Sequence, residues 1–193
     1  MCRHPRFLSD FGRAIAVVIV LVLSQPLARA ANNSPVTIGG AFKLTSPDGT
    51  TVTEQTYRGK WLLVYFGYTS CPDSCPTALL EIAVALETLG PDADELQPLF
   101  ITVDPRRDTP AVMGSYTQSF DSRIVGLTGT PQQIAAVAEE YGVYYAPRKS
   151  GSDAEHDVFD HGTYLYVMDP EGKFVRGLDA DTPGERIAEA VRG

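Results

Sequence analysis

Two short, continuously apolar segments constrain the fold of this chain more than any other feature. They cover Trp61–Phe66 and Leu99–Val103, and between them Pro76–Leu89 carries apolar residues at helical spacing. Uninterrupted apolar strands are typical of sheets that are buried on both faces. Strands that alternate with helices in this way predict a domain of the α/β class.

The rest of the pattern predicts how this unit is extended. Pro47-Asp48-Gly49 has hairpin turn chemistry between the β-rich segments Ala41–Thr45 and Thr50–Thr53. Helix starts of the capped type stand at Thr109-Pro110 and at Thr130. The remaining expected elements are a strand at Ile124–Leu127, a hairpin of Tyr164–Met168 with Lys173–Arg176, and a last helix that starts at Thr182 and ends at Val191. This order predicts a thioredoxin-like fold with an N-terminal β-hairpin.

Residues 1–30 have the three parts of a secretory signal peptide. Basic residues precede the apolar run Ala14–Leu23, and Ala28-Arg29-Ala30 is a small-residue cleavage site. An uncleaved membrane anchor is the alternative interpretation. In either case the rest of the chain is expected in the periplasm or facing it, soluble after cleavage or anchored in the inner membrane, with no other membrane contact. Residues 31–40 are expected to be a linker and residues 41–193 one domain.

The charge balance bears on the class of partner. The chain has 24 acidic and 16 basic residues, a formal net charge of −8. A nucleic-acid binder needs a basic face that displaces counterions from phosphates. No nucleic-acid partner is therefore expected.

The chemistry is concentrated in the segment Gly67–Pro76, which joins a predicted strand to a predicted helix. Of the three cysteines, Cys2 lies in the leader, which leaves Cys71 and Cys75 in this segment. Cys75 directly precedes Pro76, near a helix N-terminus that stabilises a thiolate. The spacing brings both sulfurs to one side, which suits a reversible disulfide or two thiolates on one soft metal ion. A purely stabilising disulfide is less favoured, because so small a loop removes little entropy from the unfolded chain.

Two thiolates rarely complete a metal site, so a third ligand is expected. Outside the leader the chain has two histidines, His156 and His161. His161 is expected in the loop just before the predicted strand Tyr164–Met168, facing the cysteine loop. His156 lies in a polar stretch typical of a surface loop. His161 is therefore the favoured ligand. Asp73 and Asp160 adjoin these residues and are candidates for supporting them, Asp160 through an N–H of His161.

Three motifs together resemble the Sco/SenC family of copper proteins, which are needed for cytochrome c oxidase assembly. The motifs are Tyr65–Pro76 (YFGYTSCPDSCP), Val103–Pro110 (VDPRRDTP), and Asp160-His161 before Tyr164–Gly172 (YLYVMDPEG). The resemblance implies a thioredoxin-like domain that binds one copper ion through Cys71, Cys75 and His161. It further implies delivery of that copper to the binuclear copper site of cytochrome c oxidase subunit II. Other copper chaperones or thiol reductases are further expected partners.

The donor set agrees with copper. Two thiolates and an imidazole suit three-coordinate Cu(I), and also Cu(II) when water or an oxygen donor fills a fourth position. Structural zinc and iron–sulfur clusters usually take four protein ligands. Such a carrier has no catalytic residues and is not expected to be an enzyme.

Two other functions remain open at this point. One is a thiol-disulfide reductase that uses Cys71 and Cys75 as a redox disulfide to keep the oxidase's copper-ligating cysteines reduced. The other is a peroxidase or a copper-dependent redox sensor. His161 discriminates between the carrier and the reductase, because a simple dithiol reductase does not need it. The segment Asp104–Asp108 follows the second predicted strand, where it caps the next helix, orients the copper loop or contacts the partner.

Overall fold

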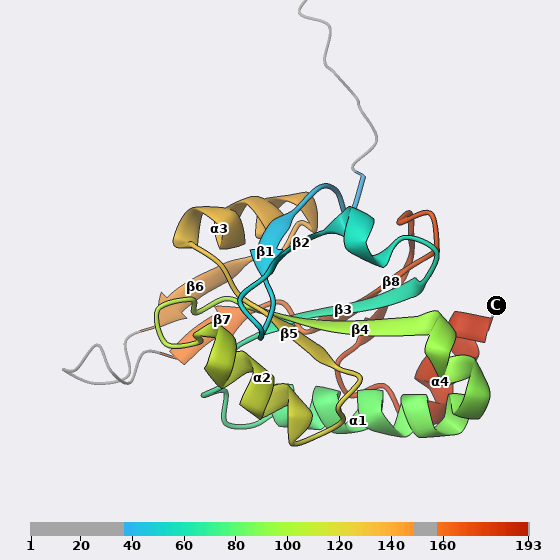
Figure 1. Cartoon of the computed structure of the whole chain (residues 1–193). Coiled ribbons are helices and arrows are strands. Elements are labelled where there is room, and N and C mark those ends of the chain that lie inside the picture. Colours follow the sequence, from blue (N-terminus) through green and yellow to red (C-terminus); the bar gives the residue numbers. More distant parts are fainter. Residues whose placement is uncertain (1–36, 149–157, 193) are drawn as a thin grey trace, which may run out of the picture. The chain divides into compact units, whose positions relative to one another are not determined.

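The computed structural model of the chain describes residues 37–148 and 158–192 (Figure 1). The expected signal peptide or anchor at residues 1–30 lies outside the described residues, and so does His156. None of the described helices has both the length and the apolar character needed to cross a membrane.

The centre of the domain is a five-stranded mixed sheet with the strand order β5-β4-β3-β8-β9. Its strands are β3 (Trp61–Gly67), β4 (Leu96–Thr102), β5 (Val125–Leu127), β8 (Tyr164–Met168) and β9 (Phe174–Asp179). The first three run parallel, while β8 is antiparallel to both β3 and β9. The two apolar segments of the sequence are the neighbouring strands β3 and β4, and β3 is buried from Leu62 to Gly67. The α/β class is thus confirmed.

Four helices cover the two faces of this sheet. They are α1 (Ser74–Leu89), α2 (Pro110–Gln118), α3 (Pro131–Glu140) and α4 (Gly184–Arg192), with short 3-10 helices η1 (Glu54–Tyr57) and η2 (Gly90–Glu95). Figure 1 shows α1, α2 and α4 on one side of the sheet and α3 on the other. The predicted caps at Thr109 and Thr130 are present, since each side chain accepts a hydrogen bond from a backbone N–H in the first turn of its helix. The order of elements confirms the thioredoxin-like fold.

A first hairpin precedes the sheet, as the sequence predicts. Strands β1 (Lys43–Thr45) and β2 (Thr51–Thr53) are antiparallel. In the turn between them, Asp48 accepts hydrogen bonds from the Ser46 hydroxyl at 2.6 Å and the Thr50 N–H at 3.0 Å. This carboxylate therefore closes the turn, as aspartate does in many turns.

A second hairpin outside the sheet was not expected from the sequence. Strands β6 (Tyr145–Arg148) and β7 (Val158–His161) pair antiparallel, with Tyr145 opposite His161. Pro147 and the polar residues that follow interrupt the alternation by which a strand is recognised. As a result His161, expected in a loop, is the last residue of a strand.

One helix boundary also differs from the expectation. Helix α1 begins at Ser74, two residues before Pro76, so Cys75 lies inside its first turn. Proline is tolerated in this turn, because its missing N–H has no partner within the helix.

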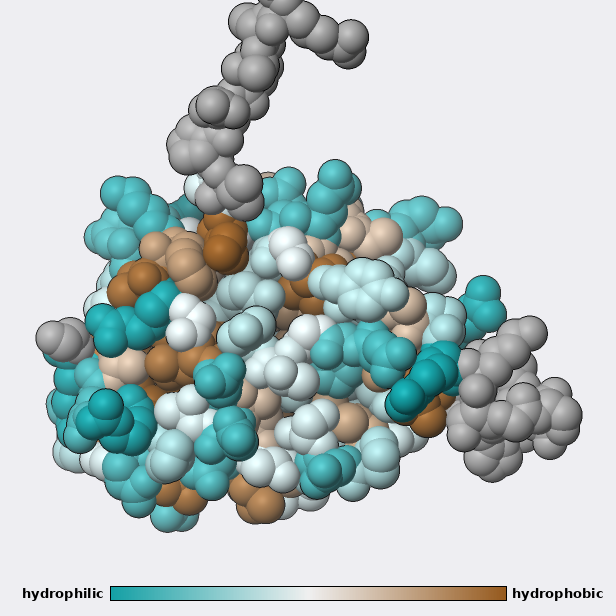
Figure 2. Space-filling model, turned by 180° about the vertical axis from the view of Figure 1, so that it is seen from behind, coloured by the Kyte–Doolittle hydropathy of each residue, from teal (hydrophilic) through white to brown (hydrophobic). Residues whose placement is uncertain are grey.

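Figure 2 shows that hydrophobic residues form small, separate patches among polar ones on the face seen from behind, as is usual for a surface in contact with water.

Candidate metal centre

The loop between β3 and α1 carries both cysteines. After Gly67 the chain turns sharply, and the Cys71 N–H donates to the Tyr68 carbonyl at 3.2 Å. Cys71 follows this turn and is 8% exposed, whereas Cys75 in α1 is completely buried. Both are free thiols in this structure. One cysteine thus stands at the surface end of the site and the other at its floor.

His161 approaches the same two sulfurs from the β6–β7 hairpin. Its Nε2 lies 3.7 Å from Cys75 Sγ, and the ligand atoms of Cys71, Cys75 and His161 all lie within 4.8 Å of one another. Its Nδ1 lies 2.9 Å from the Gly162 carbonyl oxygen. A proton on Nδ1 suits that carbonyl and leaves Nε2 as the nitrogen that faces the sulfurs. The three residues favoured as ligands are therefore brought together.

Two tyrosines hold the imidazole in place. The rings of Tyr65 and Tyr68 meet the His161 ring edge-on, with centroids 6.2 and 5.8 Å away. The Tyr65 hydroxyl also donates to Cys75 Sγ at 3.9 Å. Sequence reasoning missed Tyr65, because its position in a continuous apolar strand made it look like ordinary core. The site is thus dry and aromatic on its inner side.

Gly67 leaves the space that the Cys75 sulfur occupies. A Cβ at this position would lie 2.5 Å from Cys75 Sγ and 2.7 Å from Cε2 of Phe100. Both distances are well inside ordinary van der Waals contact. The residue was also missed from the sequence, although a glycine at the end of a buried strand often marks a close approach of another group.

The two thiols differ strongly in acidity. The hydrogen bond between them holds the pKa of the Cys71 thiol well below its usual range, and the same hydrogen bond together with burial raises the pKa of Cys75. Burial lowers the pKa of His161, but its hydrogen bonds to Cys71 and the Gly162 carbonyl outweigh this and raise it overall. Of the two thiols, Cys71 is therefore the one that loses its proton more readily. A metal that binds both sulfurs must release the Cys75 proton.

The two acidic neighbours, Asp73 and Asp160, both line the solvent depression that also contains Cys71 and His161. Asp73 is the exposed N-cap residue of α1. Asp160 forms an ion pair with Arg148 at 3.5 Å on the exposed face of the hairpin. The N–H of His161 expected to contact Asp160 is directed at the Gly162 carbonyl instead.

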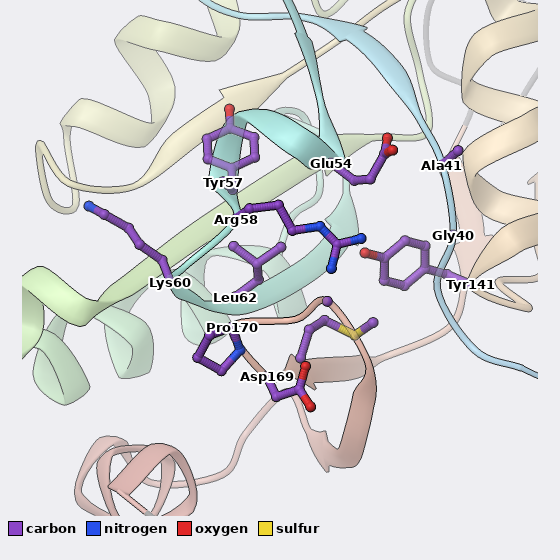
Figure 3. A pocket seen from close by; sticks show the side chains of 12 residues that line it. Gly40, Ala41, Glu54, Tyr57, Arg58, Lys60, Leu62, Tyr141, Asp169 and Pro170 are labelled. Atoms are coloured by element: carbon purple, nitrogen blue, oxygen red, sulfur yellow. The ribbon is translucent and has the colours of Figure 1, made fainter.

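The centre is open to solvent on one side. A depression of about 280 Å³ is lined by Cys71, His161, Asp73 and Arg148, among others. A separate cavity of about 120 Å³ is shown in Figure 3, where Arg58 and Tyr141 point toward each other. None of the three candidate ligands lines that cavity. Access for a metal ion is therefore through the depression over Cys71 and His161.

Known proteins are similar to this chain in both sequence and fold. Residues 30–193 match the family model SCO1/SenC. The chain is 36% identical over 171 residues to a SCO2-like protein of Rickettsia felis, across 88% of this chain and 83% of that protein. The structure of Bradyrhizobium japonicum ScoI with copper bound has a TM-score of 0.75 at 42% identity, across 80% of this chain and 98% of that one. Yeast Sco1 with copper bound has a TM-score of 0.72 at 38% identity, across 81% and 90% of the two chains.

Proposed function

This chain belongs to the SCO1/SenC family, and on that premise we propose that it binds one copper ion through Cys71, Cys75 and His161. It delivers the ion to the binuclear copper site of cytochrome c oxidase subunit II. The observation that carries the proposal is the convergence of the two sulfurs and one imidazole nitrogen within 4.8 Å. Two similar proteins of solved structure hold copper.

The donor set supports copper as the cargo. Thiolates select soft ions, and two thiolates with one imidazole complete a three-coordinate Cu(I) site. Cu(II) needs a further oxygen donor or water, which the solvent-filled depression over Cys71 and His161 can supply. Structural zinc prefers four protein ligands. Within the described residues, no cluster other than this one gathers three such ligands.

The exposure of the site supports delivery rather than storage. Only three ligands hold the ion, and two of them line the solvent depression. An incoming thiolate or imidazole of the partner can thus attack the ion before the last bond to Cys75 breaks. An export leader at residues 1–30, as the sequence predicts, would direct the domain out of the cytoplasm. Other copper chaperones or thiol reductases would then load the protein or reduce it.

A thiol-disulfide reductase is the second candidate, and one observation favours it. Cys71 has a strongly lowered pKa and stands at the solvent side of the site, as an attacking thiolate does. Cys75 lies behind it as the resolving thiol. This protein would keep the oxidase's copper-ligating cysteines reduced. His161 has no necessary role in such a reaction.

Copper titration of the reduced and oxidised protein separates the candidates. The reduced protein is expected to bind one copper per chain and the oxidised protein none, since a disulfide withdraws both thiolates. His161→Ala is expected to weaken binding sharply while the Cys71–Cys75 disulfide still forms. His156→Ala is the matched control and should bind as the parent does. Tight binding by His161→Ala would overturn the three-ligand site.

A second experiment tests delivery in cells. Cells that lack the protein are expected to lose oxidase activity and to regain it when copper is added. The His161→Ala protein should fail to restore activity at ordinary copper levels. Recovery on addition of a thiol reductant alone would favour the reductase instead.

A further inference from the structure

A buried carboxylate lies beneath the cysteine loop. Asp108, in the segment between β4 and α2, is completely buried. Its carboxylate accepts three hydrogen bonds, two from Thr69 and one from Thr102. The Thr69 N–H lies at 3.1 Å and the hydroxyls of Thr69 and Thr102 both lie at 2.5 Å. Burying a carboxyl group is costly, and these bonds offset the cost.

These bonds connect the cysteine loop to the end of β4 and the segment that follows it. Thr69 belongs to the turn that is closed by the Cys71 N–H and the Tyr68 carbonyl. Thr102 ends the central strand β4, where it is paired with Gly67. The carboxylate of Asp108 thus fastens both the backbone and the side chain of Thr69 to the segment after β4. That segment also holds Asp108 by a hydrogen bond from the Asp108 N–H to the Asp104 carbonyl at 3.0 Å, which does not depend on Thr102.

Among the three candidate ligands, Cys71 is the one that needs such a fastening. Cys75 is fixed by α1, and His161 is fixed by β7 and by its two tyrosine neighbours. Cys71 precedes the helix and is held by the turn and by one contact of its Sγ with the Ser74 hydroxyl at 3.4 Å. A loop that is ordered only on binding loses conformational entropy at that moment, which weakens binding.

We propose that Asp108 is a positioning residue of the metal centre. Its carboxylate holds the turn that includes Thr69, so that Cys71 Sγ stands ready beside Cys75 and His161 before the ion arrives. The inference rests on the proposed copper binding. It gives Asp108, the last residue of the Asp104–Asp108 segment, a role in the site. The next residue, Thr109, caps α2.

The test compares two threonines that bind the same carboxylate. Thr69→Val and Thr102→Val each remove one hydroxyl at 2.5 Å from Asp108, but only Thr69 lies in the turn. Thr102 also accepts the Asp104 N–H at 2.8 Å, so Thr102→Val should cost at least as much thermal stability. We expect Thr69→Val to lower copper affinity about tenfold, and Thr102→Val to change it by no more than about twofold.

A conservative replacement at Asp108 itself adds a second comparison. Asp108→Asn keeps an oxygen acceptor for the Thr69 N–H and should retain more copper affinity than Asp108→Ala. The absorption band from sulfur to Cu(II) should shift in Thr69→Val and Asp108→Ala but not in Thr102→Val. A residue that only stabilised the fold would leave this band in place.

A metal-free measurement keeps the outcomes distinct. The rate at which Cys71 is alkylated in the reduced protein reports its exposure without copper. We expect faster alkylation in Thr69→Val than in the parent and Thr102→Val. If the parent protein bound no copper, the proposed function would be wrong. The alkylation rate would still test whether Asp108 positions Cys71. Equal effects of the two threonine variants on affinity and on alkylation would overturn the role of Asp108.

Discussion

Replacing Gly67 by alanine would place a methyl group inside the metal centre. The new Cβ would lie 2.5 Å from Cys75 Sγ and 2.7 Å from Cε2 of Phe100. Ordinary contacts between such atoms are about 3.5–4.0 Å, so both contacts must open by about 1 Å. Gly67 is not among the glycines with positive φ, so its backbone conformation accepts alanine. The whole effect of the substitution is therefore steric.

The size of the effect follows from how each group moves. Phe100 contacts the rings of Tyr65 and Tyr116, with centroids 5.9 and 5.7 Å away. The sulfur of Cys75 is held less firmly, so it should move first. Overpacking a core costs about 1–3 kcal/mol. If this cost falls on the copper-bound state, affinity decreases about 5- to 140-fold.

The assay is competition for Cu(I) with a chelator, together with thermal unfolding. Gly126→Ala is the matched control, because its Cβ would lie 2.9 Å from the Met113 carbonyl oxygen, at the contact of β5 with α2. Both variants should melt about 2–12 °C below the parent. Only Gly67→Ala should lose copper affinity. Parent-like binding by Gly67→Ala, or an equal loss in Gly126→Ala, would refute the reasoning that this glycine makes room for the sulfur.

Two more predictions concern single polar groups. Tyr65→Phe removes the hydroxyl that donates to Cys75 Sγ, so loss of about 0.5–1.5 kcal/mol should weaken copper binding about 2- to 12-fold. The buried hydroxyl of Tyr116 has no hydrogen-bond partner among the described residues, so Tyr116→Phe should bind copper as the parent does. Equal weakening of copper binding in both variants would contradict the prediction. The Ser46 hydroxyl and the other donors of the first hairpin turn lower the pKa of Asp48 from 3.8 to about 2. The folded-state pKa is the lower one, so the carboxylate should stabilise the hairpin above about pH 4 and lose this effect as the pH falls through 2. An NMR titration of Asp48 with a midpoint near 3.8 would contradict it.

Local patterns in the sequence were enough to predict most of the fold. The strands β3 and β4 were recognised because a short apolar run in a domain of this size is typical of a buried strand. The helix starts at Thr109 and Thr130 were recognised because capping depends on residues only a few positions apart. Cys71, Cys75 and His161 could be singled out because few side chains carry such chemistry.

The missed features depend on contacts between distant parts of the chain. Tyr65 reaches a sulfur ten positions later, and Asp108 binds a threonine 39 positions earlier. Neither contact leaves a periodic signal in the sequence. The β6–β7 hairpin was missed for a related reason, since its strands are short and Pro147 interrupts the first. Consequently the candidate ligands could be named from the sequence, whereas the contacts that Tyr65 and Asp108 make around them could not.

The centre also joins parts of the chain that are far apart along the sequence. Cys75 and His161 are 86 positions apart, one in the first helix of the βα unit and the other in the late hairpin. An ion held by both closes this long loop as a covalent cross-link would, and such closures restrict the unfolded chain. Loading would therefore raise the resistance of the whole domain to unfolding, beyond the rigidity of the site itself. Release of the ion would lower the stability of the domain again. The melting temperature of a sample would therefore report the fraction of the protein that still holds copper.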